Sequence, residues 1–163
     1  MTSLVDIQVV DTSSKVPNME KIRSWTVAVF SILERPPLAL TVRIVGEEEM
    51  IDLNLRYRGK EQSTNVLSFP FESLPDLCID LLGDVIVCGP VVEREAMSQH
   101  KSLMRHWAHL IVHGMLHLFG YDHQNEQQAE IMEQLEKKVL AQLGFLKQRK
   151  KKGNISNGSY AQI

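Results

Sequence analysis

Apolar residues alternate with polar ones, or run together, in stretches that are rich in β-branched residues and bounded by turn-formers. These stretches are residues 4–10, 38–45, 65–71 and 83–88. Alternation with a period of two is typical of strands that bury one face, and continuous apolar runs are typical of strands buried on both faces. The pattern therefore predicts a mixed sheet of about four strands.

Apolar residues spaced three or four positions apart predict helices between these strands. Residues 19–34 carry such a stripe, which Pro36 and Pro37 end. We interpret the stripe as core rather than as a binding surface. Residues 47–60 begin with three glutamates and end with Arg, Lys and Gly, a charge order that compensates the dipole of a short helix.

The carboxyl half of the chain predicts longer helices. Pro90 suits a helix start, and the segment from there to about Phe119 has no further proline, so we expect one helix over residues 90–119. Residues 127–143 carry one apolar face and close at Gly144. Together with the strands, this order predicts an α+β fold in which about five helices pack on the sheet.

Composition and periodicity indicate one domain. The chain has 163 residues, of which 44% are hydrophobic, and this suits a single globular core. Apolar periodicity stops near the carboxyl end, so we expect a domain over residues 1–146 and a basic, disordered tail over residues 147–163. A lysine cluster of this kind is typical of a solvated terminus, and contact with phosphate is the alternative.

Charge, cysteines and hydropathy narrow the class of protein. The formal net charge of −2 gives no overall attraction for a nucleic acid, so such a contact has to rest on a local basic patch. Cys78 and Cys88 form no C-x-x-C pair, and we expect reduced thiols in an intracellular protein. Since no apolar run reaches the roughly 18 residues that span a bilayer, we expect no membrane partner.

All six histidines lie between residues 100 and 123. His113 and His117 are four positions apart, so on a helix their side chains leave it about 40° apart in azimuth. Gly120 can end the helix in a left-handed conformation and turn the chain so that His123 joins them. Three nitrogens that leave one position open are typical of catalytic zinc. The alternative is a row of satisfied histidines on a half-buried helix.

The spacing H-x-x-x-H-x-x-G-x-x-H is that of the metzincin peptidases, in which a glutamate after the first histidine is the general base. Here that position is Gly114, which offers no carboxylate. The sequence therefore keeps the metal site of such a peptidase, lacks its base, and favours another metal-dependent reaction.

Three blocks of the sequence resemble the YbeY family, the metal-dependent single-strand endoribonucleases of ribosomal RNA maturation. HGMLHLFGYDH, residues 113–123, is similar to the family signature H-G-x-L-H-L-x-G-Y-D-H at every fixed position. LNLRYRGKEQSTNVLSFPF, residues 53–71, is similar to the segment N-x-x-x-R-x-K-(D/E)-x-x-T-D-V-L-S-F, and LGDVIVC, residues 82–88, resembles the G-D-(I/V) strand. The resemblance covers roughly residues 4–145.

The resemblance implies one Zn2+ ion held by the three histidines of the signature, His113, His117 and His123. It also implies that Arg58 is the functionally required arginine, which suits phosphodiester cleavage because a guanidinium can clamp two phosphate oxygens as charge develops. Arg56 and Lys60 are candidates to extend the contact with RNA. Without the resemblance, these basic residues indicate only a solvated helix end that compensates its dipole.

Two further residues, Asp122 and His109, are candidates to support the histidines, and Asn65 departs from the family pattern. Asp122 could orient a histidine or assist a metal-bound water, and ordinary turn chemistry is the alternative. His109 lies one turn before His113, where we expect it to support the ligands or the core, or to line the cleft, and not to bind as a fourth ligand. At Asn65 the family more often has Asp. Asparagine keeps the shape of the aspartate side chain and lacks its negative charge.

The function implied is zinc-dependent hydrolysis of single-stranded RNA in ribosomal RNA maturation and ribosome assembly. The implied partners are ribosomal RNA and a small-subunit ribosomal protein, and no DNA. Two alternatives stay open: a non-catalytic, zinc-stabilised assembly factor, and, less favoured, a metallopeptidase. The family works in bacteria and in organelles of bacterial descent, so mitochondria are the expected location, with cytoplasm or nucleus as the alternative.

Overall fold

One mixed sheet and five helices make up residues 4–71 and 81–146, the part of the chain that the computed structural model describes. The strands are β1 (Val5–Val9), β2 (Ala39–Val45), β3 (Val66–Pro70) and β4 (Leu81–Cys88). The helices are α1 (Met19–Ile32), α2 (Glu47–Arg58), α3 (Gly89–Ser98), α4 (Leu103–Leu118) and α5 (Glu126–Gln142). The predicted α+β class, with its four strands and five helices, is confirmed.

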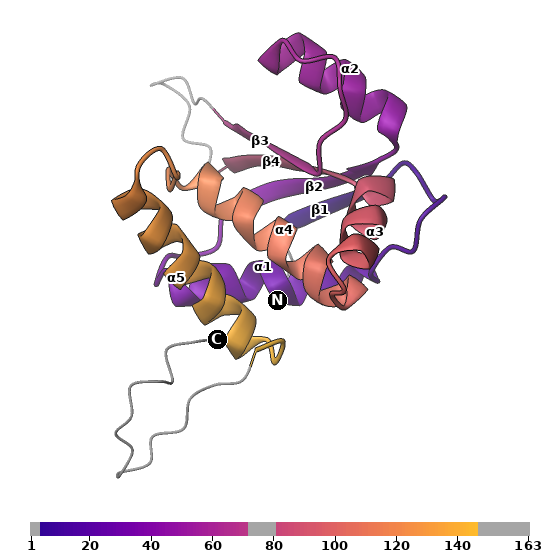
Figure 1. The fold of residues 1–163 in the computed structure, drawn as a ribbon. Helices are drawn as coiled ribbons and strands as arrows, with labels where there is room; N and C mark the ends of the chain where they lie inside the picture. The colour runs from indigo at the N-terminus through magenta and orange to yellow at the C-terminus, as the bar shows by residue number, and fades with distance from the viewer. Residues whose placement is uncertain (1–3, 72–80, 147–163) are drawn as a thin grey trace.

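The sheet has the strand order β1-β2-β4-β3. The first three run parallel, with Val42 of β2 beside Ile7 of β1 and Val85 of β4, whereas β3 runs antiparallel to β4 and forms one edge. Parallel strands at the centre of a sheet are buried on both faces, which explains the nearly continuous apolar run of β2. Figure 1 shows α1, α4 and α5 on one side of the sheet and α2 on the other.

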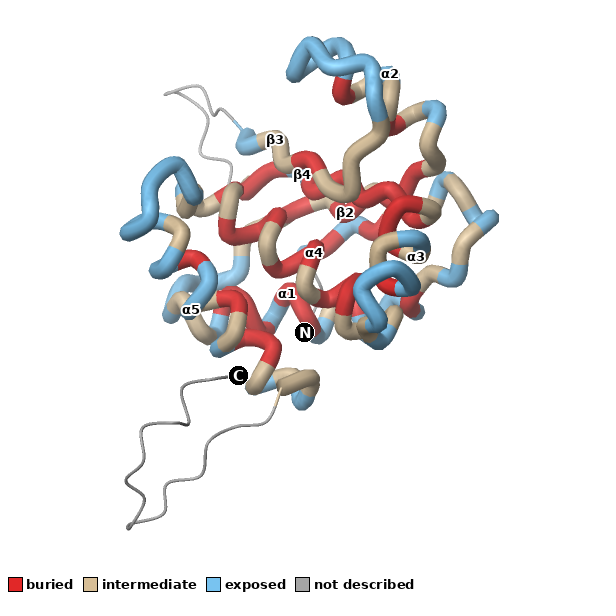
Figure 2. The backbone as a smooth tube through the Cα atoms, in the orientation of Figure 1, coloured by how far each residue is buried: buried red, intermediate tan, exposed pale blue. Residues whose placement is uncertain are grey.

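The helix α4 lies at the centre of the main core. Its residues Trp107, Ile111, Met115 and Leu116 are 0% exposed, and they belong to the cluster that also includes side chains of α1, α5 and the sheet. Figure 2 shows buried backbone along α4 and the central strands, and exposed backbone on the outer turns of α2 and α5. Burial of one such side chain contributes about 1.5–3 kcal/mol, so the packing of α4 contributes strongly to the stability of the fold.

The segment predicted as one helix over residues 90–119 forms two helices, and that prediction was wrong. His100 has a φ of 55°, which a helix interior does not accommodate. Ser102 then begins α4, because its Oγ accepts a hydrogen bond from the backbone N–H of Arg105 at 3.3 Å. The sequence signal was this serine cap, since the absence of proline does not by itself make a helix continuous.

Three other expectations concern the cysteines, the tail and membranes. The Cys88 thiol is free and buried at the end of β4. Cys78 and the predicted tail, residues 147–163, lie outside the described residues. Within the described ranges, no helix combines the length and the apolar character needed to cross a membrane.

Gly114 allows α4 to lie unusually close to the sheet. A Cβ atom at this position would be 2.8 Å from Val85 Cγ1, 3.1 Å from Ser68 Oγ and 3.2 Å from Val66 Cγ2. The hydroxyl of Ser68 donates a hydrogen bond to the Gly114 carbonyl at 2.8 Å. The position that carries the general base in metzincins therefore faces β3 and β4 here, and it has no room for a side chain.

Gly114→Ala is expected to lower the free energy of unfolding by about 1–3 kcal/mol, because the new methyl group overlaps Val85. This loss would occur although alanine is the better helix former by about 1 kcal/mol. Urea unfolding in the presence of a chelator measures it. Val85→Ala opens the missing space, so the double variant should lose less than the sum of the two single losses. Additive losses would contradict the overlap.

Candidate metal centre

Three imidazole rings meet where α4 ends. His113 and His117 lie one turn apart on α4 with ring centroids 4.6 Å apart, and the His123 ring lies 5.8 Å from the first and 5.3 Å from the second. One ring nitrogen from each histidine lies within 4.8 Å of the others, so the three could hold a metal ion. The sequence-based prediction that these residues meet is confirmed.

Gly120 makes this meeting possible. Its φ of 97° lies in a region that L side chains rarely adopt, and its N–H donates to the His117 carbonyl at 3.0 Å. The next N–H, that of Tyr121, reaches back to the Leu116 carbonyl at 3.0 Å. These bonds close the helix and reverse the chain, as the sequence predicted, so that His123 returns over the last turn of α4.

The charge state of His117 favours a metal. Burial lowers the pKa of the His117 imidazole, and the neighbouring His113 and His123 lower it further. Its Nε2 lies 3.1 Å from Nε2 of His113. Neutral imidazole is the form that binds a cation, so His117 is in the state that a metal requires. A set of imidazole nitrogens suits zinc, copper, iron or nickel better than calcium or magnesium.

Glu136 on α5 hydrogen-bonds one of the three candidate ligands, and sequence reasoning missed it. Its carboxylate lies 2.5 Å from Nδ1 of His113 and 3.0 Å from Nε2 of His109. Burial alone would raise the pKa of Glu136, but the two histidine hydrogen bonds outweigh it and lower the pKa to about 2. An ionised carboxylate only accepts, so Nδ1 of His113 carries the proton, and Nε2 keeps the lone pair that would bind a metal.

A signal for Glu136 was present in the sequence. It lies four residues after Met132 and three before Val139, so a glutamate interrupts the apolar face of residues 127–143. A buried carboxylate without a partner is costly, and an acid on a core-facing stripe therefore calls for a histidine or a cation nearby. The partner could not be identified, because His113 is 23 residues away on another helix.

His109 hydrogen-bonds the same carboxylate that holds His113. Support for the ligands is one of the roles that the sequence suggested for it. Its ligand atom and those of His113 and Glu136 also lie within 4.8 Å of one another. The two hydrogen bonds to the carboxylate explain this closeness without a second ion. His109 does not line the cavity of the three metal-binding candidates; it faces a separate cavity behind Glu136.

The three histidines open onto a cavity of about 440 Å³. Its other lining residues include Arg58 from the last turn of α2, Asp122, and residues 64–68 around the edge strand β3. Arg58 is exposed, so its guanidinium is available to a ligand. The structure thus brings Arg58 beside the histidines, although 55 positions separate it from His113 in the sequence.

Of the remaining predicted site residues, Asp122 lines the cavity of the histidines, whereas Arg56 and Lys60 do not. Asp122 accepts a hydrogen bond from the backbone N–H of His123 at 2.8 Å, which is turn chemistry, and it also lines the cavity. Arg56 forms an ion pair with Asp52 at 2.9 Å on the outside of α2. Arg56 and Lys60 are not among the residues that line the cavity, so the structure does not bring them to the histidines.

The side-chain amide of Asn65 forms hydrogen bonds with a carboxylate, which explains why an amide suits this position. Its Nδ2 donates to both oxygens of Glu95, at 3.1 and 3.3 Å, and Oε1 of the same carboxylate lies 2.9 Å from Nε2 of His106. A carboxylate at position 65 would face Glu95 with like charge. Asn65 is therefore matched to the glutamate of α3, and it also lines the cavity of the three histidines.

Comparison with known proteins identifies the family. The model of a family described as Endoribonuclease YbeY matches residues 6–144. The chain belongs to the YbeY family. The solution structure of TM1509 from Thermotoga maritima is 22% identical to it, covers 86% of this chain and 91% of its own, and superimposes with a TM-score of 0.57. At that identity the likeness shows a shared fold.

Membership of the YbeY family assigns the chain to a group of nucleases that act on RNA and function in ribosomal RNA processing. It favours a nuclease over the metallopeptidase that the metzincin spacing left open. The position of Gly114 against the sheet agrees with this, because no general base can project from it.

Glu136→Gln is expected to weaken zinc binding by about 10–100-fold, because an amide holds His113 in the metal-binding tautomer less firmly than a carboxylate does. Competition with a chromophoric chelator measures the affinity. Glu133→Gln is the matched control, since Glu133 lies on the same helix one turn earlier and is exposed. Equal affinities for both variants would show that Glu136 does not orient the ligand.

Asn65→Asp is expected to lower the free energy of unfolding by about 1–3 kcal/mol at neutral pH, because it replaces a donor to Glu95 with a second carboxylate. Like charges raise the folded-state pKa of one carboxyl above its unfolded value. The loss should therefore be full at neutral pH and shrink as the pH falls through that raised pKa.

Urea unfolding at about pH 7.5 and about pH 5.5 tests this dependence. Asn125→Asp, at the amino cap of α5, is the control, because an aspartate caps a helix as well as an asparagine does. A loss for Asn65→Asp that is the same at both pH values would contradict repulsion with Glu95.

Proposed function

We propose that the chain is a zinc-dependent endoribonuclease that cleaves single-stranded RNA in ribosomal RNA maturation and ribosome assembly. The observation that supports this most is the shared cavity, in which Arg58 and the histidines His113, His117 and His123 face the same space. A cation site beside an arginine suits a phosphodiester, because both favour the extra negative charge that develops during cleavage.

The three histidines would hold the ion, and Glu136 would keep His113 in the required tautomer. Bound zinc supplies a Lewis acid and lowers the pKa of water. Arg58 would clamp the scissile phosphate with two parallel N–H bonds. Asp122 would keep His123 in place through its bond to the backbone.

The size of the cavity suits single strands. A volume of about 440 Å³ falls within the range of small-molecule sites, which is roughly 300–1,000 Å³. One splayed nucleotide can enter such a space, whereas a stacked duplex cannot present its bases there. Residues 64–68 would form the wall along which the strand lies.

Partners and location extend the proposal. Ribosomal RNA is the proposed substrate, and a small-subunit ribosomal protein is the proposed binding partner that would present it. Mitochondria stay the predicted location, with cytoplasm or nucleus as the alternative. These expectations rest on family membership and not on the geometry of the site.

The test uses zinc-loaded protein and an end-labelled single-stranded fragment from the 3′ end of small-subunit ribosomal RNA. Arg58→Ala is expected to lower the cleavage rate by about 100–1,000-fold through loss of the phosphate clamp. His117→Ala should abolish both zinc binding and cleavage. Arg56→Ala is the matched control, because it removes an arginine from the same helix outside the cavity, and it should cleave at the wild-type rate.

Two results would count against the nuclease. Cleavage that survives His117→Ala would come from a contaminant. Fully zinc-loaded wild-type protein that binds this RNA without cleaving it would favour the non-catalytic assembly factor.

A further inference from the structure

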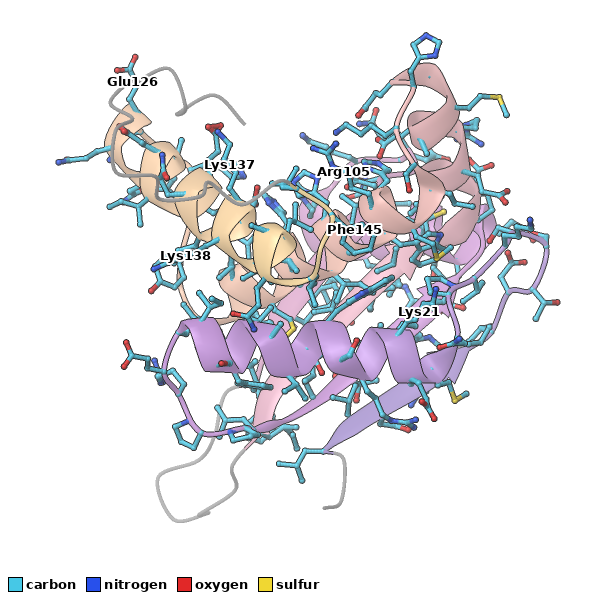
Figure 3. All side chains as sticks on the ribbon, turned by 90° about the horizontal axis from the view of Figure 1, so that it is seen from below. Lys21, Arg105, Glu126, Lys137, Lys138 and Phe145 are labelled. Atoms are coloured by element: carbon cyan, nitrogen blue, oxygen red, sulfur yellow. The ribbon has the colours of Figure 1, made fainter. Side chains whose placement is uncertain are left out.

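A second cavity, of about 200 Å³, lies between α4 and α5 behind the metal centre. Three basic side chains line it, Lys101, Arg105 and Lys137. Figure 3 shows Lys137 projecting from the side of α5 that faces α4, where Arg105 lies, whereas Lys138 lies on the other side of α5. The cavity is therefore bordered by cations from two helices.

These three cations have no anionic partner among the described residues. Each is partly buried, yet none forms an ion pair with a carboxylate of residues 4–71 or 81–146. Two acids also line the cavity, but Glu136 is taken by His109 and His113, and Glu133 is exposed. Partly buried cations without a partner favour the binding of an anion.

His106 also lines the cavity and adds no positive charge to it. Its side chain is only 4% exposed, and its Nε2 lies 2.9 Å from Glu95, a carboxylate that also accepts two bonds from Asn65. Burial lowers the pKa of His106, so the ring is neutral near pH 7. Nε2 carries the proton toward Glu95, and Nδ1 is buried with no hydrogen-bond partner among the described residues.

The cavity is joined to the metal centre through one carboxylate. Glu136 bonds His109, which lines this cavity, and His113, which lines the cavity of Arg58. The two imidazole centroids are 6.2 Å apart, so the two cavities lie on either side of Glu136. Leu146 also lines the second cavity, and the sequence that follows it, residues 147–152, contains five basic residues.

A ligand for this cavity must carry negative charge. A phosphate of an RNA backbone provides it, because it can meet Lys101, Arg105 and Lys137 together. We propose that the cavity between α4 and α5 binds a backbone phosphate of the RNA strand whose scissile phosphate lies at Arg58. This second contact rests on the proposed function. It would bind the RNA strand at a point distant from the phosphodiester that is cleaved.

The test compares two double variants that lose the same charge. Arg105→Gln with Lys137→Gln removes two cations of the cavity, and Lys21→Gln with Lys138→Gln removes two exposed lysines elsewhere, all four labelled in Figure 3. The probe is a fluorescent single-stranded oligoribonucleotide of about 16 nucleotides. Anisotropy is recorded directly after it is mixed with the zinc-loaded full chain, before cleavage proceeds, at several salt concentrations.

The cavity variant is expected to bind roughly tenfold more weakly at 0.1 M salt. The slope of log affinity against log salt should fall by about 0.7, the value for one lost phosphate contact on a single strand. The control variant should keep the wild-type slope. In cleavage, the cavity variant should show a raised KM and an unchanged kcat, because neither residue touches the scissile phosphate.

Several outcomes would overturn the proposal. Equal slopes for the two double variants, with cleavage intact, would overturn the second contact and leave the proposed function standing. Polyglutamate serves as a second probe. If the cavity variant binds polyglutamate more weakly than the wild type does, while its RNA binding is unchanged, the cavity binds an acidic polypeptide instead. A wild-type protein that neither binds nor cleaves RNA would overturn this inference and the proposed function together.

Discussion

The close packing of α4 against the sheet is the constraint on which the site depends. Gly114 brings the helix within contact distance of β3 and β4, and most of the remaining helix surface is covered by α1, α3 and α5. A helix buried on so many sides can keep polar side chains along one stripe only. That stripe holds four histidines, His106, His109, His113 and His117.

Two carboxylates from neighbouring helices determine what these histidines do. Glu95 of α3 binds His106, and Glu136 of α5 binds His109 and His113. An ionised carboxylate only accepts hydrogen bonds, so each partner fixes which ring nitrogen carries the proton. The opposite nitrogen of His113 is left with a lone pair at the candidate metal centre, whereas Nδ1 of His106 is buried without a hydrogen-bond partner among the described residues.

The same packing explains why the metzincin spacing does not carry metzincin chemistry. In those peptidases the residue after the first histidine supplies the base. Here it is a glycine pressed against Val85, and the hydroxyl of Ser68 is bonded to its carbonyl. The reactive groups beside the metal-binding histidines must therefore come from other elements, and Arg58 of α2 is the cationic one among the residues that line the cavity.

The sequence by itself determined what depends on spacing within one element. Period-two and helical patterns predicted the strands and most of the helices, and the ligands His113 and His117 with the turn at Gly120 followed from one helix and its end. Patterns of this kind reach about four residues along a helix. The absence of proline was a weaker guide to helix length, because the helical conformation is interrupted at His100, where there is no proline.

Only the tertiary structure decided which distant side chains meet. Glu136 is 23 positions from His113, and Glu95 is 30 positions from Asn65, so neither contact leaves a periodic trace in the sequence. Family resemblance pointed to Arg58, yet the cavity that it shares with the histidines exists only because β3 lies at the edge of the sheet beside α4. Such contacts arise when elements pack, since burial brings together residues that the chain keeps far apart.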